Sequence, residues 1–208
     1  MTNLHKLVSL ASESLSQVMP VATDVAGLPL ELGAMLRSRN GFTAFESALV
    51  VFPLVHGSDV PGIRDWNDLK GWRRHYLGVI GDDCVCFAQD LFGLQFVLSR
   101  SGVLRFDPEC GGVSHYAKSL EDWAKQLLQN YEEDTAWPLA HEWQLLNGVL
   151  PPNMRLLPKL PFVLGGDYEA DNLIAVECTQ AMEFWAKLFE AIGNVPDGQS
   201  VTLDGWLC

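Results

Sequence analysis

The sequence predicts an α+β protein: an antiparallel β-meander sheet, helices packed mainly on one face of that sheet, and an α/β C-terminal extension. The sheet is predicted from residues 79–110, where short apolar runs alternate with tight turns at 90–93 and 100–102, each ending in glycine. Such short connections make neighbouring strands run antiparallel. The helices are predicted from segments on both sides of the meander in which apolar residues recur every three or four positions.

Several elements are expected before the meander. They are a helix over residues 1–19, a helix from Pro29 to Asn40-Gly41, a strand over 48–52, a helix over 65–76 and a return to the sheet at 77–81. Pro29 suits the first turn of a helix, and Gly41 suits a helix stop. Asp65 is available to cap the helix that it begins.

More elements are expected after the meander. They are a Gly-rich loop at 110–113, helices over 119–129 and 139–147 with an acidic junction at 131–137 between them, strands at 162–164 and 173–177, a helix over 180–192 and a last strand at 200–206. Ser119, with Asp122 three residues later, suits a helix N-terminus. Four prolines in residues 150–161 argue against a regular element there.

The chain is expected to divide into a core domain, residues 1–130 with the N-terminal helix, and a C-terminal extension, residues 131–208. The helix over 180–192 has a broad apolar face, and leaving its side chains in water would forfeit about 1.5–3 kcal/mol each. We therefore expect the extension to pack on the core or on a second copy of the chain, which leaves a homodimer open.

The net charge of −12 is concentrated in the extension. Residues 1–130 hold 11 basic and 14 acidic side chains, whereas residues 131–208 hold 3 and 12. An acidic surface repels nucleic-acid phosphates and anionic lipids, and it attracts basic partners and speeds their encounter. The same charge also keeps a Trp-rich protein in solution, and the sequence leaves both explanations open.

The composition indicates a packed cytoplasmic protein. The hydrophobic share is 48% and the charged share 19%, which excludes a disordered chain. Five cysteines are an odd number, and a chain of 208 residues needs no disulfides for stability. Residues 1–19 lack the pattern of a signal peptide, and no run approaches the roughly 20 apolar residues of a membrane span. We therefore expect reduced thiols in the cytoplasm.

A zinc site is a weak alternative to a plain core strand around Cys84 and Cys86. The two side chains would share one face of a strand, and Cys110 and His115 would complete four ligands. Structural zinc favours pairs of cysteines separated by two residues, and no second pair follows. Two small core cysteines are the preferred interpretation, and we expect no metal.

Alternating acids at Asp167, Glu169 and Asp171 resemble part of a calcium loop. An EF-hand needs glycine at its sixth position and glutamate at its twelfth, where this chain has Asn172 and Cys178. A solvated turn is the preferred interpretation, and we expect no cofactor.

Catalysis and nucleic-acid binding are both disfavoured. Nucleophilic catalysis needs a base beside a cysteine or serine, and no pattern places any of the five histidines there. The one basic cluster, Arg73-Arg74-His75, lies between aromatic residues as in proteins that bind single strands. Asp65 and Asp68 lie within two helical turns of it, so a salt-bridged helical face is the better explanation. We expect no catalytic residue and no nucleic-acid partner.

The order of hydrophobic and turn motifs resembles a known superfamily. The motifs are Leu28-Pro29-x-x-Leu32, Arg39-Asn40-Gly41, the run at 49–52, the meander, Phe106-Asp107-Pro108-Glu109 and the helix over 119–129. Over roughly residues 28–129 they resemble the SUKH superfamily, whose members are mostly bacterial immunity proteins, with a few fungal cell-wall regulators. Residues 156–166 resemble C-terminal segments of other immunity proteins, linked to type VI secretion. The resemblance implies a SUKH-like fold and a protein that occupies a cognate toxin, often a nuclease, and blocks it.

These observations together predict a non-enzymatic binding protein, an immunity protein whose partner is a cognate toxin. Two alternatives stay open: an intracellular regulatory or scaffold protein of the same fold, and an enzyme with a site that the sequence hides. Charge density alone selects the candidate partner-binding residues Glu132, Glu133, Asp134, Asp167, Glu169 and Asp171. They would form an acidic rim that sets the association rate with a basic toxin, while a few buried anchors set the affinity.

Overall fold

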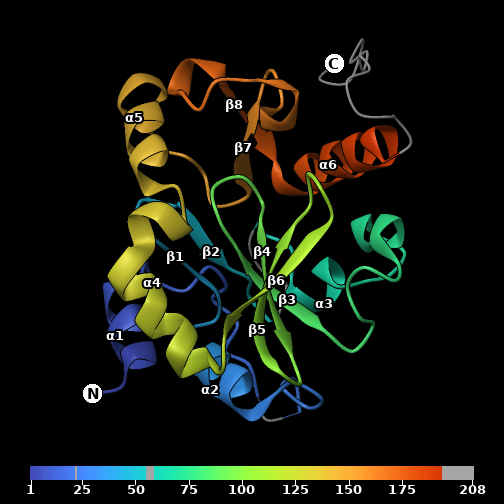
Figure 1. The fold of residues 1–208 in the computed structure, drawn as a ribbon. Helices are drawn as coiled ribbons and strands as arrows, with labels where there is room; N and C mark the ends of the chain where they lie inside the picture. Colours follow the sequence, from blue (N-terminus) through green and yellow to red (C-terminus); the bar gives the residue numbers. More distant parts are fainter. Residues whose placement is uncertain (22, 55–58, 194–208) are drawn as a thin grey trace.

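The computed structural model confirms the α+β class and describes residues 1–21, 23–54 and 59–193. Its centre is a six-stranded sheet in the order β1-β2-β3-β4-β5-β6, and β7 and β8 form a separate two-stranded sheet (Figure 1). Each strand of the large sheet pairs antiparallel with its neighbour in the chain, and β3, β4 and β5 are the three strands of the predicted meander. The strands are β1 (Phe42–Ala44), β2 (Leu49–Val51), β3 (Val85–Gln89), β4 (Gln95–Ser99), β5 (Gly102–Asp107), β6 (Gly112–Ala117), β7 (Met154–Pro158) and β8 (Leu173–Glu177).

The two predicted turns of the meander are confirmed. Between β3 and β4, Gly93 has a φ of 88°, and between β4 and β5, Gly102 has a φ of 119°, values that favour glycine. Asp90 holds the first turn, because its Oδ1 accepts hydrogen bonds from the backbone N–H groups of Phe92 and Leu94, both at 2.9 Å. A buried carboxylate thus begins the turn that links two central strands.

Three strands, β1, β6 and β7, were missed by the sequence patterns. Residues 110–113 were expected to be a loop, but β6 begins at Gly112 and pairs with β5 along its length. Residues 150–161 were expected to be irregular, but β7 fits between the prolines, with Pro158 at its last position, where a missing N–H is tolerated. The strand predicted at 162–164 is wrong: those residues form a 3-10 turn after Pro161.

The first helices are shorter than predicted. α1 (Asn3–Leu10) ends early, because the chain beyond it runs along β1, where the N–H of Ser12 donates to the carbonyl of Thr43. α2 (Leu30–Ser38) is confirmed.

The helix predicted over 65–76 is broken: α3 (Ile63–Trp66) and the 3-10 helix η1 (Trp72–Tyr76) are separated by a turn. Residues 77–81 do not join the sheet, since they form only an isolated bridge between Leu77 and Ile80.

The later helices are confirmed and longer than predicted. They are α4 (Leu120–Asp134), α5 (Trp137–Asn147) and α6 (Cys178–Ile192). Ser119 caps α4, because its hydroxyl accepts a hydrogen bond from the N–H of Asp122 at 3.1 Å. α4 continues through a kink at Asn130, so the acidic residues that follow stand on its last turn. The strand predicted at 200–206 lies outside the described residues.

Both faces of the large sheet are covered. α1 and α4 lie on one side, where Trp123 of α4 packs against Phe87 at 5.0 Å and Phe96 at 5.8 Å between ring centroids (Figure 1). α3 and η1 lie on the other side, where Tyr76 packs against Phe106 at 4.9 Å. Helices α1 and α4 therefore cover one face, and the short segments α3 and η1 cover the other.

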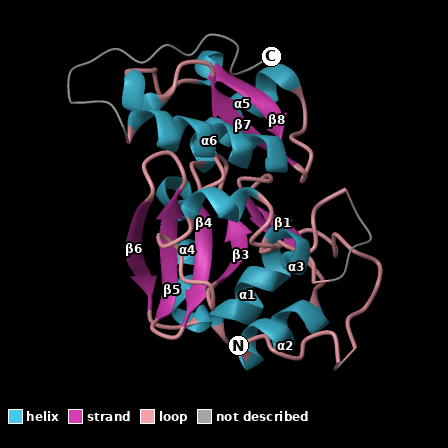
Figure 2. Cartoon of the chain, turned by 90° about the vertical axis from the view of Figure 1, so that its right-hand side faces the viewer, coloured by secondary structure: helices cyan, strands magenta, loops and turns pink. Residues whose placement is uncertain are grey.

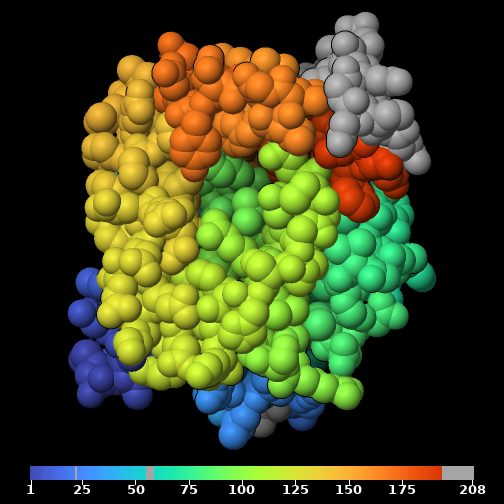
Figure 3. All heavy atoms as spheres, in the orientation of Figure 1, coloured from blue at the N-terminus to red at the C-terminus, as the bar shows by residue number. Residues whose placement is uncertain are grey.

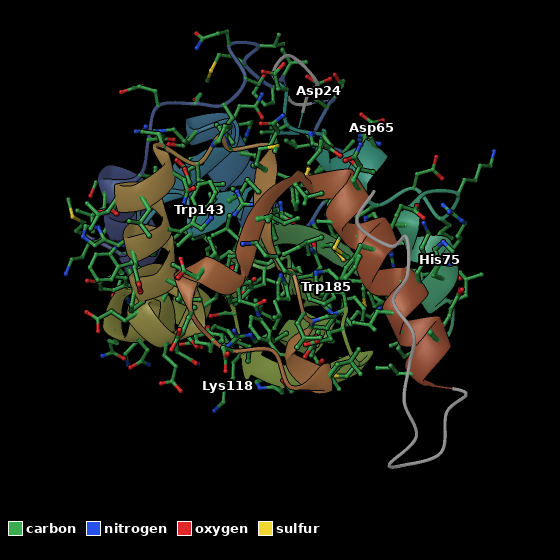
Figure 4. All side chains as sticks on the ribbon, turned by 90° about the horizontal axis from the view of Figure 1, so that it is seen from above. Asp24, Asp65, His75, Lys118, Trp143 and Trp185 are labelled. Carbon is green, nitrogen blue, oxygen red and sulfur yellow. The ribbon has the colours of Figure 1, made fainter. Side chains whose placement is uncertain are left out.

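The last helix completes the main core. α6 lies between the six-stranded sheet and the β7–β8 sheet (Figure 2), and its buried side chains belong to the same cluster as Phe87 and Trp123. Trp185 is on the side of α6 that faces the centre of the molecule, with His75 across the helix from it (Figure 4). Phe189 of α6 contacts Tyr76 at 5.1 Å. The apolar face of this helix is thus buried within the chain. Within the described residues, no helix has the length and apolar character to cross a membrane.

Candidate functional site

A pocket of about 190 Å³ opens where the meander meets the C-terminal segment, and we call it the junction pocket. It is lined by Asp90, Phe92, Leu94, Arg105, Asp107, Pro108, Glu109, Glu133, Ala136, Phe162, Tyr168 and Trp185. Figure 3 shows a hollow on this face, with the α4–α5 region on one side, residues 150–175 above it and the meander below. Segments far apart in the sequence therefore supply one concave surface.

Arg105 projects from β5 into the floor of the pocket and is held there by two acids. One guanidinium nitrogen lies 3.5 Å from Oδ2 of Asp90, and the other lies 3.4 Å from Oδ1 of Asp134. The guanidinium also donates to the carbonyl of Asp134 at 3.2 Å, and Oδ2 of Asp134 accepts a hydrogen bond from the hydroxyl of Tyr116 at 2.6 Å. The arrangement ties the end of α4 to β5 and to the first meander turn.

Asp90 is the most perturbed acid of the pocket. Its side chain is only 2% exposed. Burial raises the pKa of Asp90 to about 6, although Arg105 and the N–H groups of Phe92 and Leu94 favour the charged form. Both carboxylate oxygens have partners within the fold, so the group is part of the framework that shapes the pocket.

A pH-dependent stability follows from Asp90. Its pKa rises from an ordinary 3.8 to about 6 on folding, so the folded state keeps a proton that the unfolded state has lost. This stabilisation is fully present below about pH 4 and is lost as the pH rises through about 6. The loss amounts to about 3 kcal/mol, because one pKa unit corresponds to about 1.4 kcal/mol. Arg105, Arg155 and Tyr168 are the charged or titratable groups that act on it.

The matched comparison is Asp90→Asn, which keeps the acceptor of the turn and removes the titration. The difference in unfolding free energy between wild type and variant should fall by about 3 kcal/mol between about pH 4 and about pH 7. Urea unfolding at several pH values measures this difference. The contributions of the other carboxylates cancel because both proteins carry them. A difference that stays constant or rises with pH contradicts the assignment.

Three aromatic rings form the upper wall of the pocket. Phe92, Phe162 and Tyr168 contact one another pairwise, with ring centroids 5.1–5.6 Å apart. Phe92 is buried and Tyr168 is 58% exposed, so the ring cluster reaches from the core to the solvent. Trp185 closes the back of the pocket and donates its indole N–H to the carbonyl of Phe92 at 2.8 Å. The aromatic wall is therefore held by the ring contacts within the cluster and by the hydrogen bond from Trp185 to Phe92.

Five of the six predicted rim residues are exposed on the surface: Glu132, Glu133, Asp167, Glu169 and Asp171. Glu133 lines the junction pocket from α4, and Tyr168, which lines it from the opposite side, is flanked in the chain by Asp167 and Glu169. The two acidic segments thus each supply one lining residue, Glu133 and Tyr168, although they are more than 30 residues apart in the sequence, and the other predicted acids lie outside the lining.

Asp134 does not stand on the rim. Its side chain is 14% exposed and is engaged by Arg105 and Tyr116. It is not among the lining residues of the pocket and instead holds Arg105 in place, because the last turn of α4 directs it toward β5.

The four cysteines among the described residues all have raised pKa values. Burial raises the pKa of Cys86 and of Cys178 to about 12, and it also raises the pKa values of Cys84 and Cys110. Such thiols stay protonated at neutral pH and are weak nucleophiles and ligands. In residues 1–21, 23–54 and 59–193, no three histidine, cysteine or acidic side chains lie close enough to hold a metal ion.

The basic cluster is engaged in ion pairs with α6. Arg74 donates to both oxygens of Glu183 at 2.9 and 2.8 Å, and Nδ1 of His75 lies 2.6 Å from Glu190. Arg73 is buried and donates to backbone carbonyls, including that of Gly81 at 2.9 Å. Trp72 and Tyr76 are buried as well, so they offer no ring face on which a base can stack.

The selection by charge density did not include most of the residues that line the pocket. The most important of these are Asp90, Arg105, Phe162 and Tyr168. One local signal was available: Arg105 is a charged residue inside the apolar strand pattern of β5, and such a position needs a partner. The identity of that partner depends on tertiary contacts, which no local pattern contains.

Comparisons with known proteins give the fold only. No model of a protein family matches the chain, and no curated protein sequence matches it. A similar solved structure is the crystal structure of Atu4351 from Agrobacterium tumefaciens, with a TM-score of 0.62, 12% sequence identity and 86% coverage of each chain. At this identity the similarity shows a shared α+β architecture over most of the chain.

Proposed function

We propose that this chain is a non-enzymatic, cytoplasmic binding protein, an immunity protein that occupies a basic, cognate bacterial toxin and neutralises it. The observation that carries the proposal is the meeting of two acidic segments at one aromatic-lined pocket. A nuclease is the favoured class of toxin, because an enzyme that grips nucleic acid presents basic side chains around its active site. An acidic protein that covers those side chains blocks the substrate from the same surface.

The distribution of charge supports such a partner. The net charge is −12, and the exposed acids beside the pocket have their carboxylates directed to solvent rather than into the core. Charges of this kind accelerate the encounter with an oppositely charged protein and make it sensitive to salt. Arg105, on the pocket floor, pairs with Asp90 and Asp134 rather than with the outer acids.

The state of the ionisable groups supports binding rather than catalysis. The four thiols that the structure describes have raised pKa values, and Asp90 is engaged by two N–H groups and Arg105. The resemblance of residues 28–129 to the SUKH superfamily supports an immunity role independently of these contacts.

The test is co-expression with the gene adjacent to the one that encodes this chain. Expression of the adjacent product alone in a bacterial host should arrest growth, and co-expression with this chain should restore growth and yield a complex that co-purifies. A control variant, Leu146→Ala, changes an exposed residue of α5 and should protect like wild type. Unrelieved growth arrest, or an adjacent product that is harmless and does not bind, rejects the immunity role and favours a regulatory protein.

A further inference from the structure

The junction pocket has the size of a site for one side chain. Its volume is about 190 Å³, whereas pockets for drug-sized ligands and cofactors are about 300–1,000 Å³. It opens to the surface on the face where the partner is proposed to dock (Figure 3), and Glu133 and Tyr168 are among its lining residues. A single projecting side chain of a protein partner fits this description better than a metabolite does.

The charge of the pocket selects a cation. Asp107, Glu109 and Glu133 all line it, and Arg105 is the one basic residue among its lining residues. That guanidinium is already shared between Asp90 and Asp134, so it does not neutralise the three outer carboxylates. An anion placed in the pocket would meet three negative charges at close range, whereas a cation would be attracted by each.

A bound cation would stabilise the charged forms of two of these carboxylates, those of Glu109 and Glu133. Burial raises the pKa of Glu109, which shows that its charged form is poorly solvated, although the N–H of Val163 donates to it at 3.1 Å. Glu133 is exposed, and no hydrogen bond or ion pair to its side chain occurs within the part of the chain that the structure describes. A cationic group between the two would satisfy both.

The aromatic wall adds a second source of attraction. Phe162 and Tyr168 stand beside these carboxylates in contact with Phe92, so their orientation is fixed before a ligand arrives. Ring faces carry negative potential and attract ammonium and guanidinium groups. Carboxylates together with pre-positioned rings are the elements of a site for a lysine or arginine side chain.

We propose that the junction pocket receives one arginine or lysine side chain of the protein partner, held between the rings of Phe162 and Tyr168 and the carboxylates of Glu109 and Glu133. This inference rests on the proposed function and supplies the anchor for it. The exposed acids around the pocket guide the partner to the surface, and the pocket fixes the position in which it docks.

The test uses N-acetyl-arginine amide as the probe and N-acetyl-citrulline amide, its neutral isostere, as the control ligand. Nuclear magnetic resonance follows the indole N–H of Trp185, which lies at the back of the pocket and is assigned with Trp185→Phe. The arginine compound should shift this resonance saturably, with a dissociation constant on the order of millimolar. The citrulline compound should leave it unchanged.

Two exposed positions allow variants that keep the fold. Tyr168→Leu retains apolar area and removes the ring face, and Glu133→Gln removes one charge. Each should weaken binding of the arginine compound about two- to fivefold, and the double variant about tenfold. Glu169→Gln, which removes a charge next to Tyr168 in the chain but outside the pocket lining, should change it less than about twofold.

The outcomes separate this inference from the proposed function. Equal binding of the citrulline compound, or unchanged binding of the arginine compound in the double variant, overturns the cation pocket, even if the chain still protects cells from the adjacent product. Binding of the arginine compound with the expected losses supports the pocket, and it does so even if the growth test rejects the immunity role.

Discussion

Replacement of Arg155 by methionine should lower the free energy of unfolding by about 3–5 kcal/mol. The Arg155 side chain is fully buried, and its guanidinium donates to the carbonyls of Ser47 at 2.9 Å, Asp90 at 3.2 Å and Pro152 at 3.2 Å. It therefore joins the β1–β2 turn, the β3–β4 turn and the start of β7. Methionine fills similar volume but leaves three carbonyls, one buried and two partly buried, without this donor.

The β1–β2 turn makes this arginine more important than its hydrogen bonds alone suggest. Phe45, Glu46 and Ser47 have φ values of 54°, 53° and 63°, a left-handed conformation that costs about 1–3 kcal/mol for each non-glycine residue. Contacts on both sides hold it, since Gln144 of α5 donates to the carbonyl of Glu46 at 2.9 Å and Arg155 donates to that of Ser47. Without Arg155 the turn is free to relax.

The cost of burying the charged guanidinium of Arg155 opposes the stabilisation from its hydrogen bonds. Burial lowers the pKa of Arg155 to about 10, so its charged form is less well solvated in the fold than in water. Replacing a whole buried ion pair by apolar groups is often harmless, but the partners here are backbone carbonyls, which no substitution removes. The loss of donors should therefore outweigh the relief of desolvation.

Urea unfolding measures this effect, with Arg100→Met as the control. Arg100 pairs with Asp83 at 3.0 Å, but its side chain is 91% exposed, and its loss should cost less than about 0.5 kcal/mol. Equal small losses in the two variants would contradict the structural role of Arg155.

Trp185→Ala should cost about 3–5 kcal/mol and preserve a single unfolding transition. Trp185 is 2% exposed, its indole N–H donates to the carbonyl of Phe92, and its helix shares the main core with the six-stranded sheet. Because α6 is part of that core, the helix and the sheet should lose their structure together.

Circular dichroism and tryptophan fluorescence during urea unfolding test this cooperativity, with Leu146→Ala as the control. Leu146 is 67% exposed on α5, and its loss should change stability by less than about 0.5 kcal/mol. Two separate transitions, with the sheet retained after the helical signal is lost, would show that α6 is not part of the core.

The sequence was most informative where structure depends on neighbouring residues. Gly93 and Gly102 mark turns because only local backbone geometry is involved, and Ser119 marks the start of α4 because a cap needs only its own next residues. The helix over 65–76 failed for a tertiary reason: Trp66 and Trp72 both have to reach the sheet, and the chain turns between them to bury both rings.

The candidate site was predictable only in part. The acidic residues were found because charge density is a local property, but Asp134 was placed on the rim although it pairs with Arg105. Phe162 and Tyr168 gain their significance from Phe92, which is about 70 residues away in the chain. A pocket assembled from separate segments has no local signature, and neither does the left-handed turn held by Arg155.

The association rate between this chain and the product of the adjacent gene measures whether negative charge guides the partner to this surface. Salt should slow association strongly between about 0.1 M and about 1 M, where the screening length falls from about 10 Å to about 3 Å. Neutralising Glu132, Glu133, Asp167, Glu169 and Asp171 together should slow it at low salt as well, because these acids attract the basic partner. An association rate that changes with neither salt nor these substitutions would show that these acids do not guide a basic partner.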